Sequence, residues 1–532
     1  MRSNKSFWIT AIATYTIAWG WSFLFANAYF WDDWHSFFGK TPQEHAQFWG
    51  GSPKKHFLNP IINPFLLTQF SGVWIFRVLV FAMMFGAGVF VYKIISRIHF
   101  FPRESCQFFT LVFLLVPVNH ARFSIQTFEY SFSVFFFFLG WYLILLRKPV
   151  WRLCSLGAFL IAIGTPSLSV FMVLPLINLY FEDQPRSIRS FLIWLTKHID
   201  VYILVIVSMI FYKSVDNGTS QYTSRTSGIV YSILFGCVIF AYLFLLLSRK
   251  QSRPIRQQTL ISSAIALIWL GTIPYWIIGY NPIKALPNIF QLYAGARIHD
   301  GEYLLLMISV FKLVATIFIG FLVLYLLSKV RNIGSLIISN LLIFLYLINT
   351  YFVGPMQWES RLQLLWPLGL ALLSLGLFEK IPIRFHRKNT FALVIMLTFV
   401  SSLISAEYYV DSLKQRALVS EIQTVLKNPN GKVLIVTENG YSLNARQRTY
   451  RNYEWSGIIN SAIHDDRNTL KTVVIIDDDL TCTIFIRCVA LHATVKSSFF
   501  QALINRHVDI EIKCNDRSPI AVPPTFLSCI SG

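Results

Sequence analysis

The residues most able to do chemistry are two adjacent aspartates, Asp32 and Asp33, which lie between Trp31 and Trp34 in the stretch NAYFWDDWHSFFGK. They follow an apolar run long enough to cross a bilayer. In a chain with only 26 acidic residues, a pair of carboxylates at a membrane surface points to function. One of them could act as a general base toward an attacking hydroxyl. The structural alternative is helix N-capping, in which aspartate accepts hydrogen bonds from free backbone N–H groups.

The composition indicates a membrane protein. Of the 532 residues, 55% are hydrophobic and 14% are charged, against about 25% charged in an ordinary soluble domain. Apolar runs of about 17 to 25 residues recur until about residue 410, and each is long enough to span a bilayer as a helix. The predicted spans are 7–30, 73–95, 107–119, 129–146, 153–164, 167–181, 199–213, 229–247, 260–279, 303–327, 334–353, 362–378 and 390–410.

The predicted fold class is therefore a polytopic α-helical membrane protein with about 13 transmembrane helices. A net charge of +20 would suggest nucleic acid in a soluble protein, but here Lys and Arg gather in alternate short loops. The positive-inside rule makes those loops cytoplasmic, so no nucleic-acid partner is expected. Arg2 and Lys5 precede the first run, which we interpret as an uncleaved helix with a cytoplasmic N-terminus. An alternative to the short pair 153–164 and 167–181 is a single span kinked at Pro166, which would invert everything downstream.

The domain boundary is predicted near residue 410. Residues 1–410 form the transmembrane domain, and residues 411–532 contain short β-branched runs with one candidate helix, which is typical of a small α/β domain. An odd number of spans puts this domain outside the cytoplasm. Its cysteines are expected to form disulfides of undetermined connectivity, because no CxxC pair or His cluster supports the alternative, a metal site. These are Cys482, Cys488, Cys514 and Cys529.

Two predicted outer loops carry the other candidate residues. The first outer loop, 31–72, includes FLNPIINPFLLTQF, which is typical of an interfacial segment that lies on the membrane. In the second outer loop, 119–128, Arg122 precedes Glu129, the acid that opens the fourth span. The structural alternative for Glu129 is an acid favoured by the helix dipole, and Arg122 is either an interface residue or suited to binding phosphate.

These features resemble the GT-C superfamily of integral-membrane glycosyltransferases, in particular the branch of protein O-mannosyltransferases and the lipid A aminoarabinose transferase. The resemblance covers the acid pair, a loose counterpart of the HPP(L)-like stretch at HFLNPIINPFL from His56, and Arg77 at the start of the second helix. It continues through Pro117, Arg122 and Glu129 and includes a late outer SR motif at Arg361. One departure is TPS at the outer tip of the fifth helix, where the family often has a TK pair.

The resemblance implies inverting transfer of a monosaccharide from a polyprenyl-phosphate donor to a hydroxyl of a glycan, lipid or protein outside the cytoplasm. Asp32 would be the base and Asp33 would orient it or the acceptor, with Glu129 as a second acid. A divalent cation, Mg²⁺ or Mn²⁺, assists some relatives, but the sequence offers no clear ligand set for one. The residues expected to bind substrate are His35, Lys54, Lys55, His56, Arg122, Arg297 and Arg361.

Three other functions stay open. A transporter or flippase of lipid-linked sugars would place charged residues or broken helices near the bilayer midplane, whereas these acids lie at the outer interface. A polymerase or ligase of lipid-linked glycans typically has a large late outer loop, whereas here the first is the large one. A non-catalytic scaffold is the third alternative. The expected location is a bacterial inner membrane, with a periplasmic active site.

Overall fold

A computed structural model describes residues 2–203 and 365–521 apart from short breaks. Four of the predicted spans, between 229 and 353, lie outside the described residues, as does most of 199–213. The breaks are 32, 40, 51–57, 71, 98–101, 118–119, 166–167, 169–170, 184–187, 202, 379–382, 426–432, 439–442, 446–449, 464–472 and 476–482.

The chain divides into two compact units. Unit 1 comprises residues 1–85, 122–132 and 396–532, and unit 2 comprises residues 86–121 and 133–395. The predicted division at residue 410 does not coincide with this arrangement, because α18 runs unbroken from Ile383 to Val425 and its last 30 residues belong to unit 1. The loops that carry the candidate site residues 33, 122 and 129 therefore fall in the same unit as the C-terminal strands.

Unit 1 starts with a helix that is shorter than the predicted first span. Helix α1 covers Arg2–Trp19, and a 3-10 turn, η1, continues to Phe23. Residues 24–30, which the apolar pattern assigned to the span, lie beyond the helix and lead into α2 (Asp33–Ser36). The segment predicted as the first outer loop contains two further helices, α3 (Pro42–Gly50) and α4 (Asn59–Gln69), before α5 (Trp74–Ile95).

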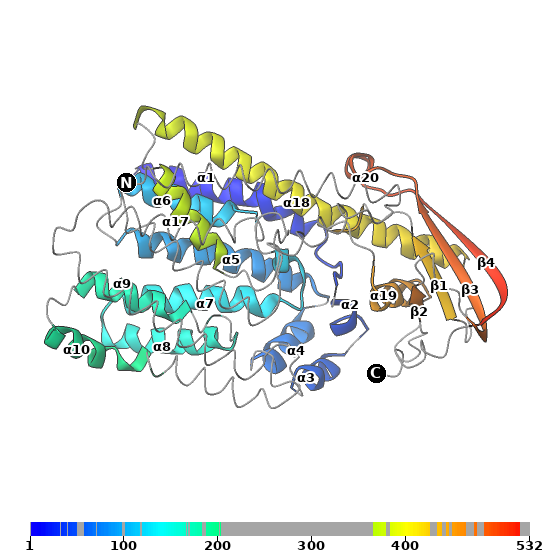
Figure 1. Ribbon diagram of the computed structural model, residues 1–532, viewed down its shortest axis with the longest axis horizontal. Helices are drawn as coiled ribbons and strands as arrows, with labels where there is room; N and C mark the ends of the chain where they lie inside the picture. Colours follow the sequence, from blue (N-terminus) through cyan, green and yellow to red (C-terminus); the bar gives the residue numbers. More distant parts are fainter. Residues whose placement is uncertain are drawn as a thin grey trace, which may run out of the picture. The chain divides into compact units, whose positions relative to one another are not determined.

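The C-terminal part of unit 1 is a mixed four-stranded sheet of order β2-β1-β3-β4 (Figure 1). Strand β1 (Val433–Glu438) is parallel to β2 (Val473–Ile475) and to β3 (Thr483–Val495), and β4 (Ile510–Ala521) is antiparallel to β3. Helix α19 (Asn452–Ile463) connects β1 to β2, as a parallel crossover requires, and α20 (Phe499–Asn505) lies between β3 and β4.

The sheet register bears on the predicted disulfides. Cys488 is paired with Arg517, and Cys514 is paired with Leu491. The two cysteines are therefore three residues apart along the β3–β4 ladder rather than directly opposed. Cys482 and Cys529 lie outside the described residues, so disulfides in this domain stay a prediction.

Unit 2 is helical throughout its described part. It contains α6 (Arg103–Leu115), most of α7 (Phe128–Ile144), α8 (Pro149–Ile163) and α9 (Val173–Asp183). Helix α10 (Ile188–Lys197) lies in what was predicted as a cytoplasmic loop, and α17 (Trp366–Phe378) packs on α6. Apolar side chains form the core, and α6 alone buries ten residues.

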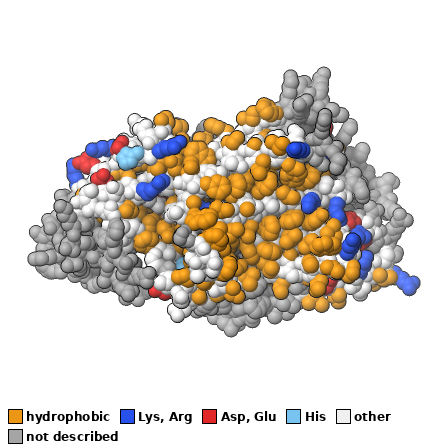
Figure 2. Space-filling view, turned by 180° about the vertical axis from the view of Figure 1, so that it is seen from behind, with side chains coloured by type: hydrophobic (Ala, Val, Ile, Leu, Met, Phe, Trp, Pro, Cys, Tyr) orange, Lys and Arg blue, Asp and Glu red, His pale blue; other side chains and the backbone are white. Residues whose placement is uncertain are grey.

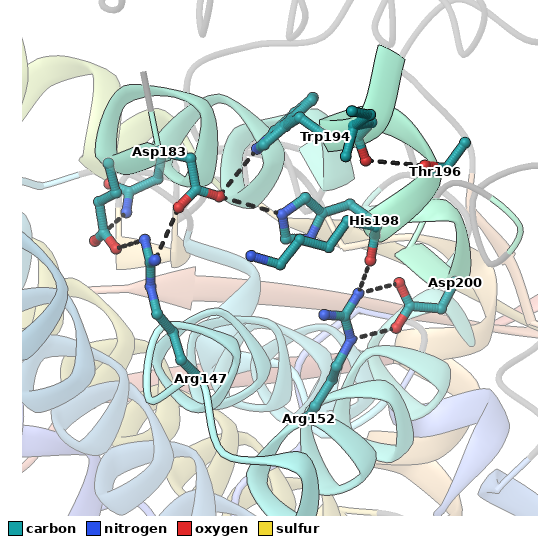
Figure 3. Close-up of polar contacts among 11 residues, drawn as sticks. Arg147, Arg152, Asp183, Trp194, Thr196, His198 and Asp200 are labelled. Carbon is teal, nitrogen blue, oxygen red and sulfur yellow. Dashed lines mark hydrogen bonds and ion pairs between the residues drawn. The ribbon is translucent and has the colours of Figure 1, made fainter. Parts of the chain in front are cut away.

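A polar cluster joins α8, α9 and α10 within unit 2 (Figure 3). Asp183 forms an ion pair with Arg147 at 2.8 Å and accepts a hydrogen bond from Trp194 at 3.2 Å. The guanidinium of Arg152 donates hydrogen bonds to both carboxylate oxygens of Asp200, each at 2.7 Å. Charged side chains thus fix the positions of these helix ends, and none of them belongs to the predicted site.

Two helices are long and apolar enough to cross a membrane, Trp74–Ile95 and the Thr390–Val425 part of α18. Helices α7 and α8 are also apolar but shorter. Large apolar side chains are exposed on α1, α4, α8, α10 and α18, and Figure 2 shows hydrophobic side chains over much of the described surface on one side. The described part of the chain is thus mostly helical and compatible with a membrane protein, while the number of spans and their direction stay predictions.

Close helix packing in unit 2 depends on a glycine. A Cβ at Gly140 of α7 would lie 2.8 Å from the Cδ1 of Phe159, whose ring is fully buried. We expect Gly140→Ala to lower stability by about 1–3 kcal/mol, as overpacking of a core does. The matched control is Gly157→Ala on α8, where a Cβ meets nothing within 4 Å and helix propensity improves. Thermal unfolding in detergent tests this, and equal melting temperatures for the two variants would contradict it.

Candidate functional site

Asp33 is the centre of the polar contacts between the first and second outer loops. Its side chain is fully buried at the first position of α2. Oδ1 accepts hydrogen bonds from the Ser124 hydroxyl at 2.7 Å and from the Gln126 N–H at 2.8 Å. Oδ2 accepts from the N–H groups of Phe30 and Ile125, both at 3.0 Å. These four bonds fill the usual acceptor positions of a carboxylate.

This geometry bears on the role of Asp33. A buried carboxylate with four donors has no oxygen lone pair left for a substrate hydroxyl. Burial raises the pKa of Asp33, whereas the positive charge of Arg77 and the donors act in the opposite direction. Asp33 is therefore a positioning residue that fixes the loop beside it. Asp32, the expected base, lies outside the described residues.

Arg77 holds the same loops from the side of α5. Its Nε donates to the carbonyl of Ala26 at 3.1 Å, and its two terminal nitrogens donate to the carbonyls of Ala28 and Phe123. The side chain is buried, at 3% exposure, and its guanidinium lies 5.1 Å from the centre of the Phe30 ring. Arginine's several donors in a planar fork suit this binding of three carbonyls. The positive Arg77 thus binds carbonyl groups of these segments, and the negative Asp33 binds their N–H and hydroxyl groups.

Arg122, expected to bind a lipid phosphate, packs against an aromatic ring. Its guanidinium carbon lies 3.9 Å from the centre of the Trp19 ring, and the residue is only 8% exposed. Burial lowers the pKa of Arg122 to about 10, so the side chain stays positive at neutral pH. A cation over an indole face is favourable, more so when water is excluded. In this structure Arg122 anchors the second loop, and its contact with phosphate stays a prediction.

Glu129 opens α7 in its first turn, where the helix dipole favours a negative charge. Its carboxylate accepts a hydrogen bond from the Asn59 side-chain amide, on α4 of the first outer loop. Glu129 is half-buried, unlike Asp33, and so is the acid among the described site residues with access to a ligand. The structure thus connects the second predicted acid to the helix that was expected to lie on the membrane.

The C-terminal part of unit 1 contacts the acid-pair segment directly through α19. Glu454, 1% exposed, accepts a hydrogen bond from the Trp31 N–H at 3.1 Å and another from the Arg451 N–H at 2.8 Å. One helical turn later, Gly457 lies against Trp34, so closely that a Cβ there would be 2.2 Å from Cε3 of the indole. Both tryptophans that flank the aspartates therefore contact α19, Trp31 through its backbone N–H and Trp34 through its ring.

Tyr408 of α18 packs on the other side of this segment. Its ring stacks on Phe123 with centres 4.0 Å apart and meets the edges of Phe30 and Trp31 at 5.3 and 5.7 Å. Aromatic pairs in these geometries add to the stability that burial provides. Segments from four parts of the sequence, near residues 30, 123, 408 and 454, thus form one packed cluster.

A cleft of about 440 Å³ opens beside the cluster, within unit 1. Its lining includes the segment from Phe23 to Tyr29, residues of α18 that include Gln415 and Arg416, and Ser461 of α19. Phe23 and Leu24 are exposed apolar residues, 44% and 57% exposed, while Arg416 is an exposed cation. The cleft lining therefore combines exposed apolar side chains with polar groups and a positive charge, a combination suited to an amphiphile with an anionic head group.

Several predicted residues cannot be compared with this geometry. The backbone of His35 lies in α2, but its side chain is outside the described part of the structure. Among the described residues, no group of three or more His, Cys, Asp or Glu side chains is arranged to hold a metal ion. Lys54, Lys55, His56, Arg297 and Arg361 also lie outside the described residues.

Sequence reasoning missed Arg416, Glu454 and Gly457, which complete the site from the C-terminal side. Arg416 follows the predicted end of a span at residue 410 and was treated as part of a separate domain. A helix that continues past its apolar stretch was the available signal, because the helical pattern of α18 has no proline or glycine to end it. Nothing in the sequence indicated that α19 would pack on the acid pair.

The chain matches no protein-family model, and no curated protein or solved structure shows significant similarity to it. A function for this protein must therefore be argued from the geometry of the site.

Replacement of Asp33 should weaken the whole site. Asp33→Ala leaves four donors without an acceptor and Arg77 without its charge partner, so we expect a loss of about 3 kcal/mol. Ser124→Ala removes a single donor and should cost about 1 kcal/mol. Denaturant or thermal unfolding in detergent measures both. A wild-type melting temperature for Asp33→Ala would show that the carboxylate does not hold the loops.

The seat of Trp34 on α19 can be tested by adding one methyl group. Gly457→Ala should displace the indole and expose the first outer loop to protease, because the ring is buried and cannot move aside without losing its packing. Asn460→Ala, on the same helix, is the control and should leave cleavage unchanged. Identical digestion of both variants would contradict the contact.

Proposed function

We propose that the protein is a multi-pass membrane glycosyltransferase that moves a monosaccharide from a polyprenyl-phosphate donor to a hydroxyl group outside the cytoplasm. The observation that carries the proposal is the cleft, whose lining contains exposed apolar residues together with Arg416 and amide side chains. A lipid-linked phosphate has the matching chemistry, since its chain is apolar and its head group is anionic and rich in hydrogen-bond acceptors.

The length of α18 supports an interfacial position for this cleft. A helix of 43 residues is about 65 Å long, roughly twice the thickness of the hydrocarbon core of a bilayer. Its apolar part begins near Thr390, and Ser412, Gln415 and Arg416 lie beyond the predicted end of the span at residue 410. Arg416 would then stand where a membrane-bound donor presents its phosphate.

The proposed reaction is a displacement at the anomeric carbon of the donor. The acceptor oxygen forms a bond to that carbon on the face opposite the phosphate, and the bond between the carbon and the phosphate oxygen breaks. The electron pair leaves with the lipid phosphate, whose growing negative charge Arg416 would stabilise. The acceptor proton passes to a carboxylate, for which Asp32 is our choice and Glu129 the second candidate. Asp33 keeps the segment that carries Asp32 in place.

The proposal includes a location and a topology. We infer a bacterial inner membrane, a cytoplasmic N-terminus, and a C-terminal domain on the outer side with the acid pair. The contacts of Glu454 and Gly457 with Trp31 and Trp34 support this, since α19 and the acid pair must lie on the same side of the membrane. The acceptor is a cell-envelope glycan, lipid or protein.

Transfer from radiolabelled polyprenyl-phosphate sugars in membranes tests the proposal. We expect Asp32→Asn to lower the rate at least about 100-fold through loss of the base, and Arg416→Gln to lower kcat/KM by about 10- to 100-fold. Arg506→Gln, an exposed arginine outside the cleft, is the matched control and should be unchanged. Movement of the donor across the membrane with no transfer would instead favour a flippase, and joining of whole glycan chains would favour a polymerase or ligase.

A further inference from the structure

The first two turns of helix α4, residues 59–65, have their polar and apolar faces reversed relative to a soluble protein. Asn59 and Asn63 are buried, at 4% and 3% exposure, whereas Ile61 and Phe65 are 66% and 60% exposed. A helix on a water-soluble surface places apolar residues inward and polar residues outward. The reversed pattern fits a helix that rests against lipid on its outer side and encloses polar groups on its inner side.

The two inward asparagines differ in how their side chains are satisfied. Asn59 and Asn63 are four residues apart, so their side chains lie on the same face of α4, one turn from each other. The Asn59 amide nitrogen donates to the Glu129 carboxylate. The Oδ1 of Asn63 is buried and has no hydrogen-bond partner among the described residues.

Other polar side-chain atoms of the first outer loop are also buried without a hydrogen-bond partner among the described residues. In the described part of this loop, Trp34 Nε1 and Ser36 Oγ are also buried without a hydrogen-bond partner. Burying such atoms without a partner is unfavourable, and folded proteins keep few of them. Their concentration in the loop that carries the acid pair indicates that a polar ligand completes their hydrogen bonding.

We propose that Asn63, with the Asn59–Glu129 pair, binds hydroxyl groups of the donor's sugar ring, an inference that rests on the proposed function. The unsatisfied atom of Asn63 is an acceptor, and Glu129 is an anion, so the ligand must supply hydrogen-bond donors. A phosphate would be repelled by Glu129 and has no donor to offer when ionised. Ring hydroxyls meet the requirement, and they would enter on the inner side of α4, away from lipid.

The stability of the free protein separates this role from a structural one. If Asn63 served packing alone, replacing it with the similarly sized leucine would remove an unfavourable buried atom and change nothing else. If Asn63 binds sugar, the same change should stabilise the free protein and weaken its complex with a sugar-bearing lipid. A rise in stability accompanied by a loss of binding is typical of a residue retained for function.

The experiment measures melting temperatures of the full-length protein in nanodiscs, with undecaprenyl phosphate and with undecaprenyl-phosphate glucose, galactose or mannose. We expect at least one sugar-bearing lipid to stabilise the wild type more than undecaprenyl phosphate does. Asn63→Leu should melt at or above the wild-type temperature without lipid and should bind that sugar lipid roughly 10-fold more weakly. Binding of undecaprenyl phosphate should not change. Asn505→Leu, exposed on α20, is the control for the substitution.

Asn63→Ala serves the same purpose should the leucine variant not fold. The inference is overturned if no sugar lipid stabilises the wild type beyond undecaprenyl phosphate, or if Asn63→Leu keeps the extra stabilisation. Transfer is assayed on the same samples to separate the two proposals. Extra stabilisation that depends on Asn63, without transfer to any acceptor, would overturn the proposed function alone. Transfer with an unaltered effect of sugar lipid on Asn63→Leu would overturn this inference alone.

Discussion

The site depends on one buried carboxylate. Asp33 accepts four hydrogen bonds from two loops that are about 90 residues apart in sequence, and Arg77 supplies the opposite charge while it holds three carbonyls of the same loops. A charge removed from water is stable only when its hydrogen bonds are complete, so this arrangement tolerates little change in the position of either loop. The expected base, Asp32, is the neighbour of Asp33 in the sequence.

Around this point, the chain brings together segments that a linear reading keeps apart. Helix α18 contributes Tyr408 to the aromatic cluster and Arg416 to the cleft, and α19 contributes Glu454 and Gly457 to the seat of the tryptophans. The C-terminal part of the protein is therefore part of the candidate site. In a membrane enzyme that acts on a lipid-borne donor, this arrangement would let one element bind the phosphate while another shapes the space for the acceptor.

Sequence reasoning was strong where the signal was local. The β-branched runs at 433, 473 and 510 form strands, the segment at 454 is helical, and the apolar run at 73–95 is a single helix. It was weak where tertiary packing decides. Within the first predicted span, the α-helix ends at Trp19 and a 3-10 turn ends at Phe23. The residues that follow line the cleft, and two of their carbonyls accept hydrogen bonds from Arg77. The composition of that segment is mostly apolar, like the rest of the run, and so it cannot reveal this.

The same limit applies to the functional residues. The scarcity of acids singled out Asp32, Asp33 and Glu129. The sequence of the pair does not show which carboxylate is buried, because the groups that donate hydrogen bonds to Asp33 lie near residue 125. The long strand β3 went unrecognised because it carries Arg487 and His492 and lacks clear boundaries. The asparagines of α4 looked like part of an interfacial segment, and only their burial shows that they face inward.

The most direct test of the role of Asp33 is hydrogen exchange of backbone amides in the wild type and in Asp33→Asn. We predict that the amides of Phe30, Ile125 and Gln126 exchange slowly in the wild type and accelerate together in the variant. The amide of Trp31, which donates to Glu454 rather than to Asp33, should accelerate with them, because the carboxylate holds the whole segment. Fast exchange at Ile125 and Gln126 in the wild type, or a variant in which Trp31 stays protected, would contradict this role.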